Sequence, residues 1–154
     1  MGTHRTIPIK QYGDIVQNNE KLSGAATPGH LLEFFSTAGS VRVHSTAGGN
    51  ALPMFALESD LEGEEITHAL TSGEEIQAWI AKRGDEVNAL IKNGENIAVG
   101  DLLESAGDGT LEKFEADSAG AEHVEHIVGQ AMEAVDMSDS SGADPSGRCR
   151  TLIW

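Results

Sequence analysis

Short runs of alternating apolar and polar residues, separated by Gly-rich turns, dominate the chain. From Val41 to His44, valines alternate with polar residues, a pattern typical of a half-buried strand. The same period returns through residues 75–103, interrupted at Arg83–Asp85 and at Asn93-Gly94, a pair favoured in tight turns. This region therefore predicts a meander of antiparallel strands.

Other segments predict further short strands. Met54–Leu57 is apolar at every position, which indicates a central strand buried on both faces. Strands are also predicted at residues 111–114 and 148–153. Residues 121–135 fit either the apolar stripe of a helix or a core strand, and Gly129 would cost a helix about 1 kcal/mol. The whole pattern predicts a mainly β fold, a small β-barrel or β-sandwich with short helical segments.

The chain is long enough for one domain with its own core, and its charge is unevenly distributed. Residues 1–24 carry three cations and two carboxylates, net +1, whereas the whole chain carries −15. The basic N-terminal segment is either a frayed terminus or an arm that becomes ordered on a partner. We assign residues 1–24 to an extended N-terminal arm and residues 25–154 to a β-rich domain, with residues 138–147 as an exposed loop.

Composition excludes several classes of protein. A net charge of −15 opposes binding to nucleic-acid phosphates and to anionic membranes. No segment approaches the roughly 18–20 consecutive apolar residues of a membrane-spanning helix. Residues 1–10 lack the apolar region of an export signal, and the single cysteine cannot form an internal disulfide. We expect synthesis in a reducing cytosol, with no nucleic-acid or membrane partner.

Catalytic motifs are absent from the sequence. It contains neither a Gly-x-Ser-x-Gly nucleophile motif nor a phosphate-binding loop ending in Lys-Ser or Lys-Thr. Cys149 lies between two arginines, which would activate an exposed thiol. In the alternating pattern, however, it shares a face with Thr151 and Ile153, which favours a buried and unreactive thiol. We expect that the protein is not an enzyme.

Two groups of residues resemble metal ligands. On a helix, His123 and His126 would share one face and could bind zinc, whereas on a strand they would point to opposite faces. Asp136, Asp139 and Asp144 lie in one loop, but their spacing does not match an EF-hand calcium site. We expect no metal or other cofactor, and a metal-dependent enzyme using the two histidines is a weaker alternative.

Lys92 precedes the Asn93-Gly94 turn, where a lipoyl or biotinyl carrier has its modified lysine. Its flanking residues, Ile91 and Asn93, are not those of such carriers, and the position is better explained by a lysine that protects a strand end. A carrier of this type, or a sugar-binding β-barrel module, is the main alternative function.

The two tryptophans are candidates for a subunit interface. Trp79 falls on the polar face of its predicted strand, between Gln77 and Ala81, so it is expected outside the core. Trp154 is the last residue of the sequence given. Either both residues contact another chain, or they cluster with each other.

A series of motifs resembles, in its order, the head decoration (cement) proteins of tailed bacteriophages, of the lambda-like type. The motifs span about residues 5–154 and end with the terminal strand; they are Thr27–Leu32, Ala56–Glu58, Gly84–Leu90, Gly100–Leu111 and Gly129–Asp136. Each motif is common turn and strand sequence, and the resemblance rests on the ordered set.

The resemblance implies a structural virion protein, made in the host cytoplasm, that coats the outer surface of the expanded capsid. It implies a homotrimer at three-fold sites that stabilises the shell by bridging subunits of the major capsid protein. It also implies an N-terminal arm that clamps the capsid by adding a strand to it, with Ile7 and Ile9 as anchors. The residues assigned to this arm are Thr6, Ile7, Pro8, Ile9 and Tyr12.

Overall fold

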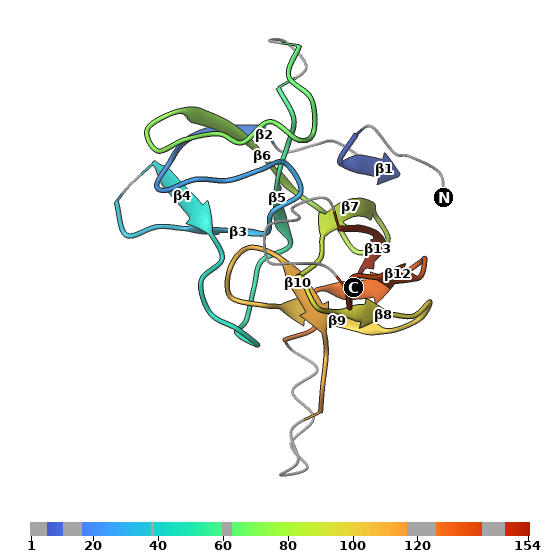
Figure 1. Ribbon diagram of the computed structural model, residues 1–154. Helices are drawn as coiled ribbons and strands as arrows, with labels where there is room; N and C mark the ends of the chain where they lie inside the picture. The colour runs from blue at the N-terminus through green and yellow to red at the C-terminus, as the bar shows by residue number, and fades with distance from the viewer. Residues whose placement is uncertain (1–5, 11–16, 38, 60–62, 117–125, 140–146) are drawn as a thin grey trace.

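Figure 1 shows the computed structural model of the chain, which describes residues 6–10, 17–37, 39–59, 63–116, 126–139 and 147–154. These residues form thirteen strands and no α-helix. The strands are β1 (Pro8–Lys10), β2 (Gln17–Leu22), β3 (Leu32–Phe34), β4 (Ser40–Val43), β5 (Met54–Ala56), β6 (Glu75–Ile80), β7 (Glu86–Leu90), β8 (Asn96–Ile97), β9 (Leu102–Ser105), β10 (Leu111–Lys113), β11 (Gly129–Ala131), β12 (Val135–Asp136) and β13 (Arg148–Ile153). The predicted mainly β fold is confirmed.

Short helical segments were expected, and the sequence of residues 121–135 fits either a helix or a core strand. Residues 126–136 contribute strands β11 and β12, whereas residues 121–125 lie outside the described part. A side chain does not fit at Gly129, because a Cβ atom there would lie 2.6 Å from the Leu152 carbonyl oxygen. The glycine thus allows β11 to approach β13 closely.

A five-stranded sheet with the order β3-β4-β2-β6-β5 closes on itself as a small barrel. Closure comes from an antiparallel bridge between Leu31 and Phe55, and from the Ala56 N–H, which donates to the His30 carbonyl at 2.9 Å. Alternate residues of each strand fill the interior, as in other small barrels. The interior side chains on these strands are Leu22, Leu32, Val41, Met54, Ala56, Ile76 and Ala78.

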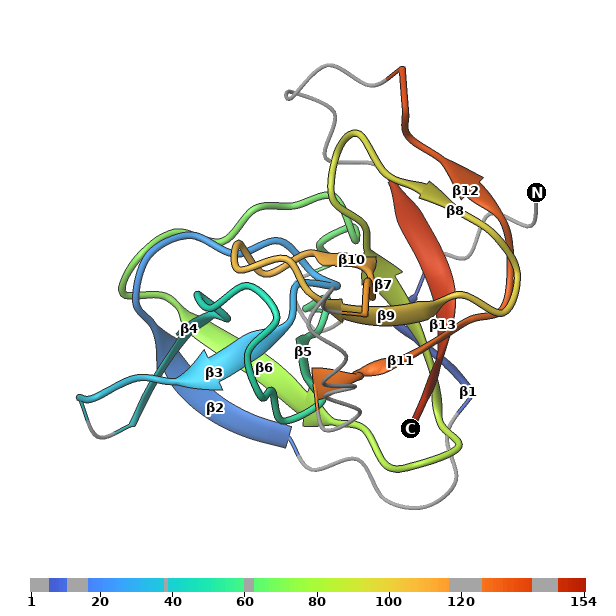
Figure 2. The same cartoon turned by 90° about the horizontal axis from the view of Figure 1, so that it is seen from below.

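A six-stranded antiparallel sheet with the order β1-β7-β13-β11-β9-β10 lies beside this barrel (Figure 2). Its inner face contributes Val87, Leu103 and Ile153 to a second, larger core. Phe55 and Trp79 enter the same core from the outer face of the barrel. Strands β5 and β6 are therefore buried on both faces, as was predicted for Met54–Leu57.

The predicted meander through residues 75–103 is wrong. The turn at Arg83–Asp85 connects two different sheets, because β6 belongs to the barrel and β7 to the six-stranded sheet. Gly94 has the positive φ (91°) that a tight turn requires, yet β8 pairs with β12 and not with β7. Local alternation and turn residues mark where strands begin and end, whereas packing against distant segments selects their partners.

The assignment of residues 1–24 to an extended arm also needs correction. Strand β2 lies inside the barrel sheet between β4 and β6, where residues 17–21 pair with residues 75–79. Strand β1 pairs with β7 in the other sheet. Strand β2 was not predicted because its sequence is mostly polar and has no alternating apolar pattern. Backbone pairing with β6 places it in the sheet. Residues 1–5 and 11–16 lie outside the described residues.

The loop predicted at residues 138–147 is described only at its ends. Ser138 and Asp139 are exposed, Gly147 is buried, and residues 140–146 lie outside the described part.

Candidate assembly surface

The end of β13 and the turn before β7 form a groove of about 310 Å³ on the outer face of the six-stranded sheet. The groove is lined by Arg83, Gly84, Gln130, Leu152, Ile153 and Trp154. Backbone hydrogen bonds connect the segments that line the groove. The Gly84 N–H donates to the Ile153 carbonyl at 2.9 Å, and Gln130 lies opposite Leu152 in the β11–β13 pair. The Gln130 side-chain amide donates to the Gly100 carbonyl at 2.8 Å, which fixes one wall.

Trp154 stands at the edge of this groove with 52% of its surface exposed. The Arg83 guanidinium carbon lies 5.8 Å from the ring centre, within the range of a cation–π contact. Arg83 and its neighbour Lys82 are both exposed. Within the described residues, neither side chain lies within ion-pair distance of a carboxylate, unlike the cations of four other pairs: Arg42–Glu33, Lys92–Glu112, Lys113–Asp101 and Arg150–Glu86.

A further exposed apolar residue, Met132, follows the groove residue Gln130 in the chain. Met132 is 38% exposed and follows Gln130 by two residues, and its N–H donates to the Arg150 carbonyl at 2.8 Å. An exposed tryptophan beside arginine and apolar side chains is typical of a protein–protein contact. We therefore regard the groove and Met132 as the candidate assembly surface.

Trp79, predicted at a subunit interface, is only 1% exposed and belongs to the protein's own core. It lies opposite Phe55 across the β5–β6 ladder. The prediction was wrong because it assumed that one face of β6 meets solvent. Residues of the six-stranded sheet pack around Trp79 on that face. Trp154 alone of the two predicted interface residues lies on the surface.

The residues of the predicted capsid-binding arm have different environments. Ile7 is fully buried in the larger core, which corrects its assignment as an anchor for another chain. The buried Glu58 carboxylate holds this segment, since it accepts the Ile7 N–H at 3.2 Å and the Thr6 hydroxyl. Pro8 and Ile9 are partly buried in β1, and Tyr12 lies outside the described residues.

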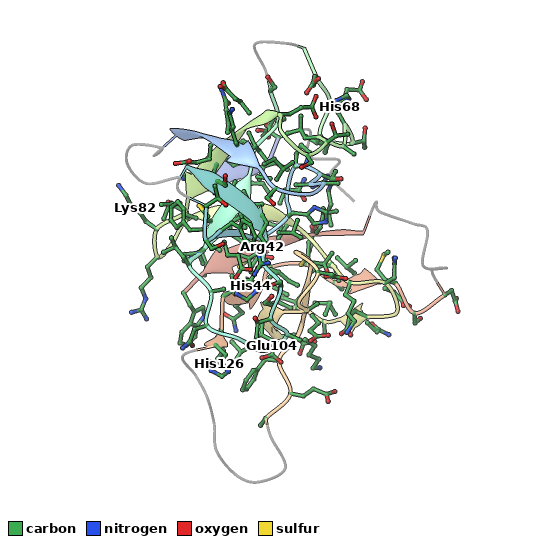
Figure 3. All side chains as sticks on the ribbon, turned by 90° about the vertical axis from the view of Figure 1, so that its left-hand side faces the viewer. Arg42, His44, His68, Lys82, Glu104 and His126 are labelled. Carbon is green, nitrogen blue, oxygen red and sulfur yellow. The ribbon has the colours of Figure 1, made fainter. Side chains whose placement is uncertain are left out.

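His44 and Ser105 form a pair that the sequence did not indicate, because the two residues are 61 positions apart. The His44 Nδ1 atom lies 2.7 Å from Ser105 Oγ, and Glu33 Oε2 lies 3.8 Å from Nε2 (Figure 3 shows His44 with Arg42). This geometry resembles a serine nucleophile with its base. Ser105 is fully buried, however, so a substrate cannot reach its hydroxyl in this conformation.

Other residues considered for chemistry occupy structural positions. Cys149 is fully buried, as predicted, and burial raises the pKa of its thiol to about 11. Lys92 forms an ion pair with Glu112, a contact that raises the pKa of the lysine. A carrier lysine needs a free, exposed amine, and this contact does not favour that alternative.

His126 lies near Glu104 at one end of the molecule (Figure 3), and His123 lies outside the described residues. Burial and the neighbouring Glu112 raise the pKa of Glu104. Within the described ranges, no group of three or more histidine, cysteine or acidic residues is arranged to hold a metal ion. The same part of the chain contains no helix that is long and apolar enough to cross a membrane.

The fold and the groove together define the class of protein, an all-β domain with a small barrel, a second sheet and a solvent-facing groove that contains a tryptophan. A solved structure with a similar fold is the head fiber gp8.5 N base of bacteriophage phi29, with a TM-score of 0.55 and 16% sequence identity. The similarity covers 91% of this chain and 93% of that chain. At this identity the likeness establishes the fold. No family model and no curated protein sequence matches the chain.

Proposed function

We propose that this protein is a structural component of a tailed-bacteriophage virion that binds the outer surface of the expanded capsid. The observation that carries the proposal is the fold shared with the phi29 head fiber base over 91% of the chain. The ordered sequence motifs, which resemble those of head decoration proteins, support the same conclusion independently.

In this proposal the protein is made in the host cytoplasm, forms a homotrimer at three-fold sites and bridges subunits of the major capsid protein. It needs no cofactor and catalyses no reaction. The net charge of −15 supports a partner that is neither nucleic acid nor membrane. The candidate assembly surface supports a protein partner, because tryptophan and arginine dominate the binding energy of many protein interfaces.

Stabilisation would be additive. Each copy contributes a modest contact, and linked contacts around the shell act with a high effective concentration. Because the protein binds only the assembled capsid, it shifts the equilibrium away from disassembled subunits by mass action.

Co-sedimentation with heads of the phage that encodes this chain tests the proposal. We expect saturable binding to expanded heads, weaker binding to unexpanded heads, and a higher temperature of head disruption when the sites are filled. The control variant is Trp79→Phe, which keeps a large aromatic side chain in the core and leaves the surface unchanged. Absence of binding to expanded heads would refute the proposal.

A further inference from the structure

The turn at Lys82 and Arg83 is the anomalous part of the surface. The chain carries −15, yet this turn has two adjacent exposed cations that form no ion pair within the described residues. The half-exposed ring of Trp154 lies beside them, with Leu152 and Gln130 completing the groove. Asp85 in the same turn is 2% exposed and accepts the Lys82 N–H, so its carboxylate caps the turn from within.

The complementary surface on this molecule is the segment of residues 63–75. It contains four glutamates and neither lysine nor arginine, and three of the glutamates are exposed: Glu65, Glu74 and Glu75. The segment is held on the barrel by the pairing of Leu70 with Ala26 and by the Leu22 N–H, which donates to the Glu74 carbonyl at 2.9 Å. Lys21 lies opposite Glu75 in the ladder and offsets one of these charges.

The groove with its two cations, Lys82 and Arg83, and the acidic segment 63–75 lie apart on one molecule. In Figure 3, Lys82 lies at the left and His68, a residue of the acidic segment, lies at the top right. His68 marks the acidic segment, since its Nε2 atom lies 3.1 Å from Glu64 Oε1. The two surfaces can therefore meet only when they belong to different copies, in a head-to-tail contact that closes into a ring if the rotation permits.

We propose that the groove formed by Arg83, Trp154 and Leu152 binds the acidic segment 63–75 of a second copy of this chain. The inference rests on the homo-oligomer in the proposed function and names its interface. Lys82 and Arg83 steer the approach and fix the register, whereas the apolar side chains supply contact area. Because exposed charge pairs are screened over about 8 Å at physiological salt, the association weakens as salt rises.

Sedimentation velocity of the full chain, at about 50 mM and about 500 mM salt, measures this association. Lys82→Glu with Arg83→Glu should raise the dissociation constant about tenfold or more, because like charges then face each other. Glu65→Lys with Glu75→Lys should do the same. Combining the four substitutions should restore the wild-type constant to within about threefold. Glu74 is left unchanged, because its carboxylate accepts the Thr71 N–H and hydroxyl.

Two control variants separate specific contact from net charge. Lys92→Glu with Lys113→Glu changes the net charge as much as the groove substitutions but lies outside the groove. It also breaks the ion pairs with Glu112 and Asp101, so the melting temperature is compared first, and in the folded variant the constant should remain within about threefold. Adding Lys92→Glu and Lys113→Glu to the Glu65→Lys, Glu75→Lys variant should not restore association. Far-UV circular dichroism confirms that each variant is folded.

The inference would be overturned by a wild-type monomer at both salt concentrations, by an oligomer unaffected by either charge reversal, or by a four-substitution variant that stays dissociated. A groove variant that loses capsid binding but keeps its oligomeric state would also overturn it, and would assign the groove to the capsid. Co-sedimentation distinguishes the two failures, because a monomer that binds expanded heads refutes the interface between copies but leaves the proposed capsid binding intact.

Discussion

Replacing His30 with asparagine tests how far the stability of this protein depends on a partly buried, neutral imidazole. The His30 Nδ1 atom accepts the Thr27 N–H at 2.9 Å, so this nitrogen carries no proton in the folded state. Burial lowers the pKa of His30 to about 4; Asp108 opposes this shift and Arg148 adds to it. Protonation would create a positive charge at a site largely shielded from water. It would also make Nδ1 a donor that faces the Thr27 N–H, another donor.

The magnitude follows from linkage. The pKa of His30 falls from 6.5 in the unfolded chain to about 4 in the folded protein. Because the unfolded state binds the proton more readily, this contribution is fully present above pH 6.5 and is lost as the pH falls toward 4. At about 1.4 kcal/mol per pKa unit, the loss is about 3 kcal/mol, a large fraction of the stability of a typical domain.

Asparagine can accept the Thr27 N–H through its side-chain oxygen but does not titrate. The free energy of unfolding is measured by guanidinium titration at pH 7 and at pH 4 for both proteins. We expect the decrease from pH 7 to pH 4 to be about 3 kcal/mol smaller in His30→Asn than in the wild type. The matched control is His68→Asn at an exposed histidine, 47% of whose side chain is accessible. Equal pH dependence of wild type and His30→Asn, or an NMR titration of His30 near pH 6.5, would refute the reasoning.

Three further predictions concern the core. Trp79→Ala should lower the free energy of unfolding by about 3–5 kcal/mol in chemical denaturation and leave the oligomeric state unchanged, since Trp79 is buried; dissociation of a folded variant would contradict this. Ile7→Ala should cost about 2–5 kcal/mol, and deleting residues 1–14 should destabilise the body, because Glu58 loses its hydrogen-bond donors; an unchanged melting temperature would refute that role. Cys149 should react with a thiol reagent only as fast as the protein unfolds, and rapid labelling of the native protein would show that the thiol is accessible.

The surface chemistry was only partly predictable. Trp154 was identified as a candidate for contact with another chain because it is a large apolar residue just after the predicted terminal strand. Arg83, Leu152 and Gln130 were missed, although alternation in the last strand already places Leu152 on the face opposite Cys149. No local signal brings Arg83 to Trp154, because the two residues are 71 positions apart and meet only through the pairing of β13 with β7.

The sequence by itself determined the fold class and part of the strands. Alternating apolar residues and Gly-containing turns predicted a mainly β protein, the terminal strand with Cys149 inside, and burial of both faces around Met54. These features depend on neighbouring residues, since side chains alternate along any strand.

Tertiary structure alone decided strand partners and which faces meet solvent. Strands β6 and β7 are adjacent in sequence yet belong to different sheets, and Trp79 and Ile7 fill a core assembled from both. Because β6 is packed on both sides at Trp79, the neighbouring polar residues do not show which face meets solvent. The edge strand β1 is only three residues long, which is too short to show an apolar pattern. Non-local packing overrides local preference at these positions, because burying an apolar side chain contributes more than local strand propensity does.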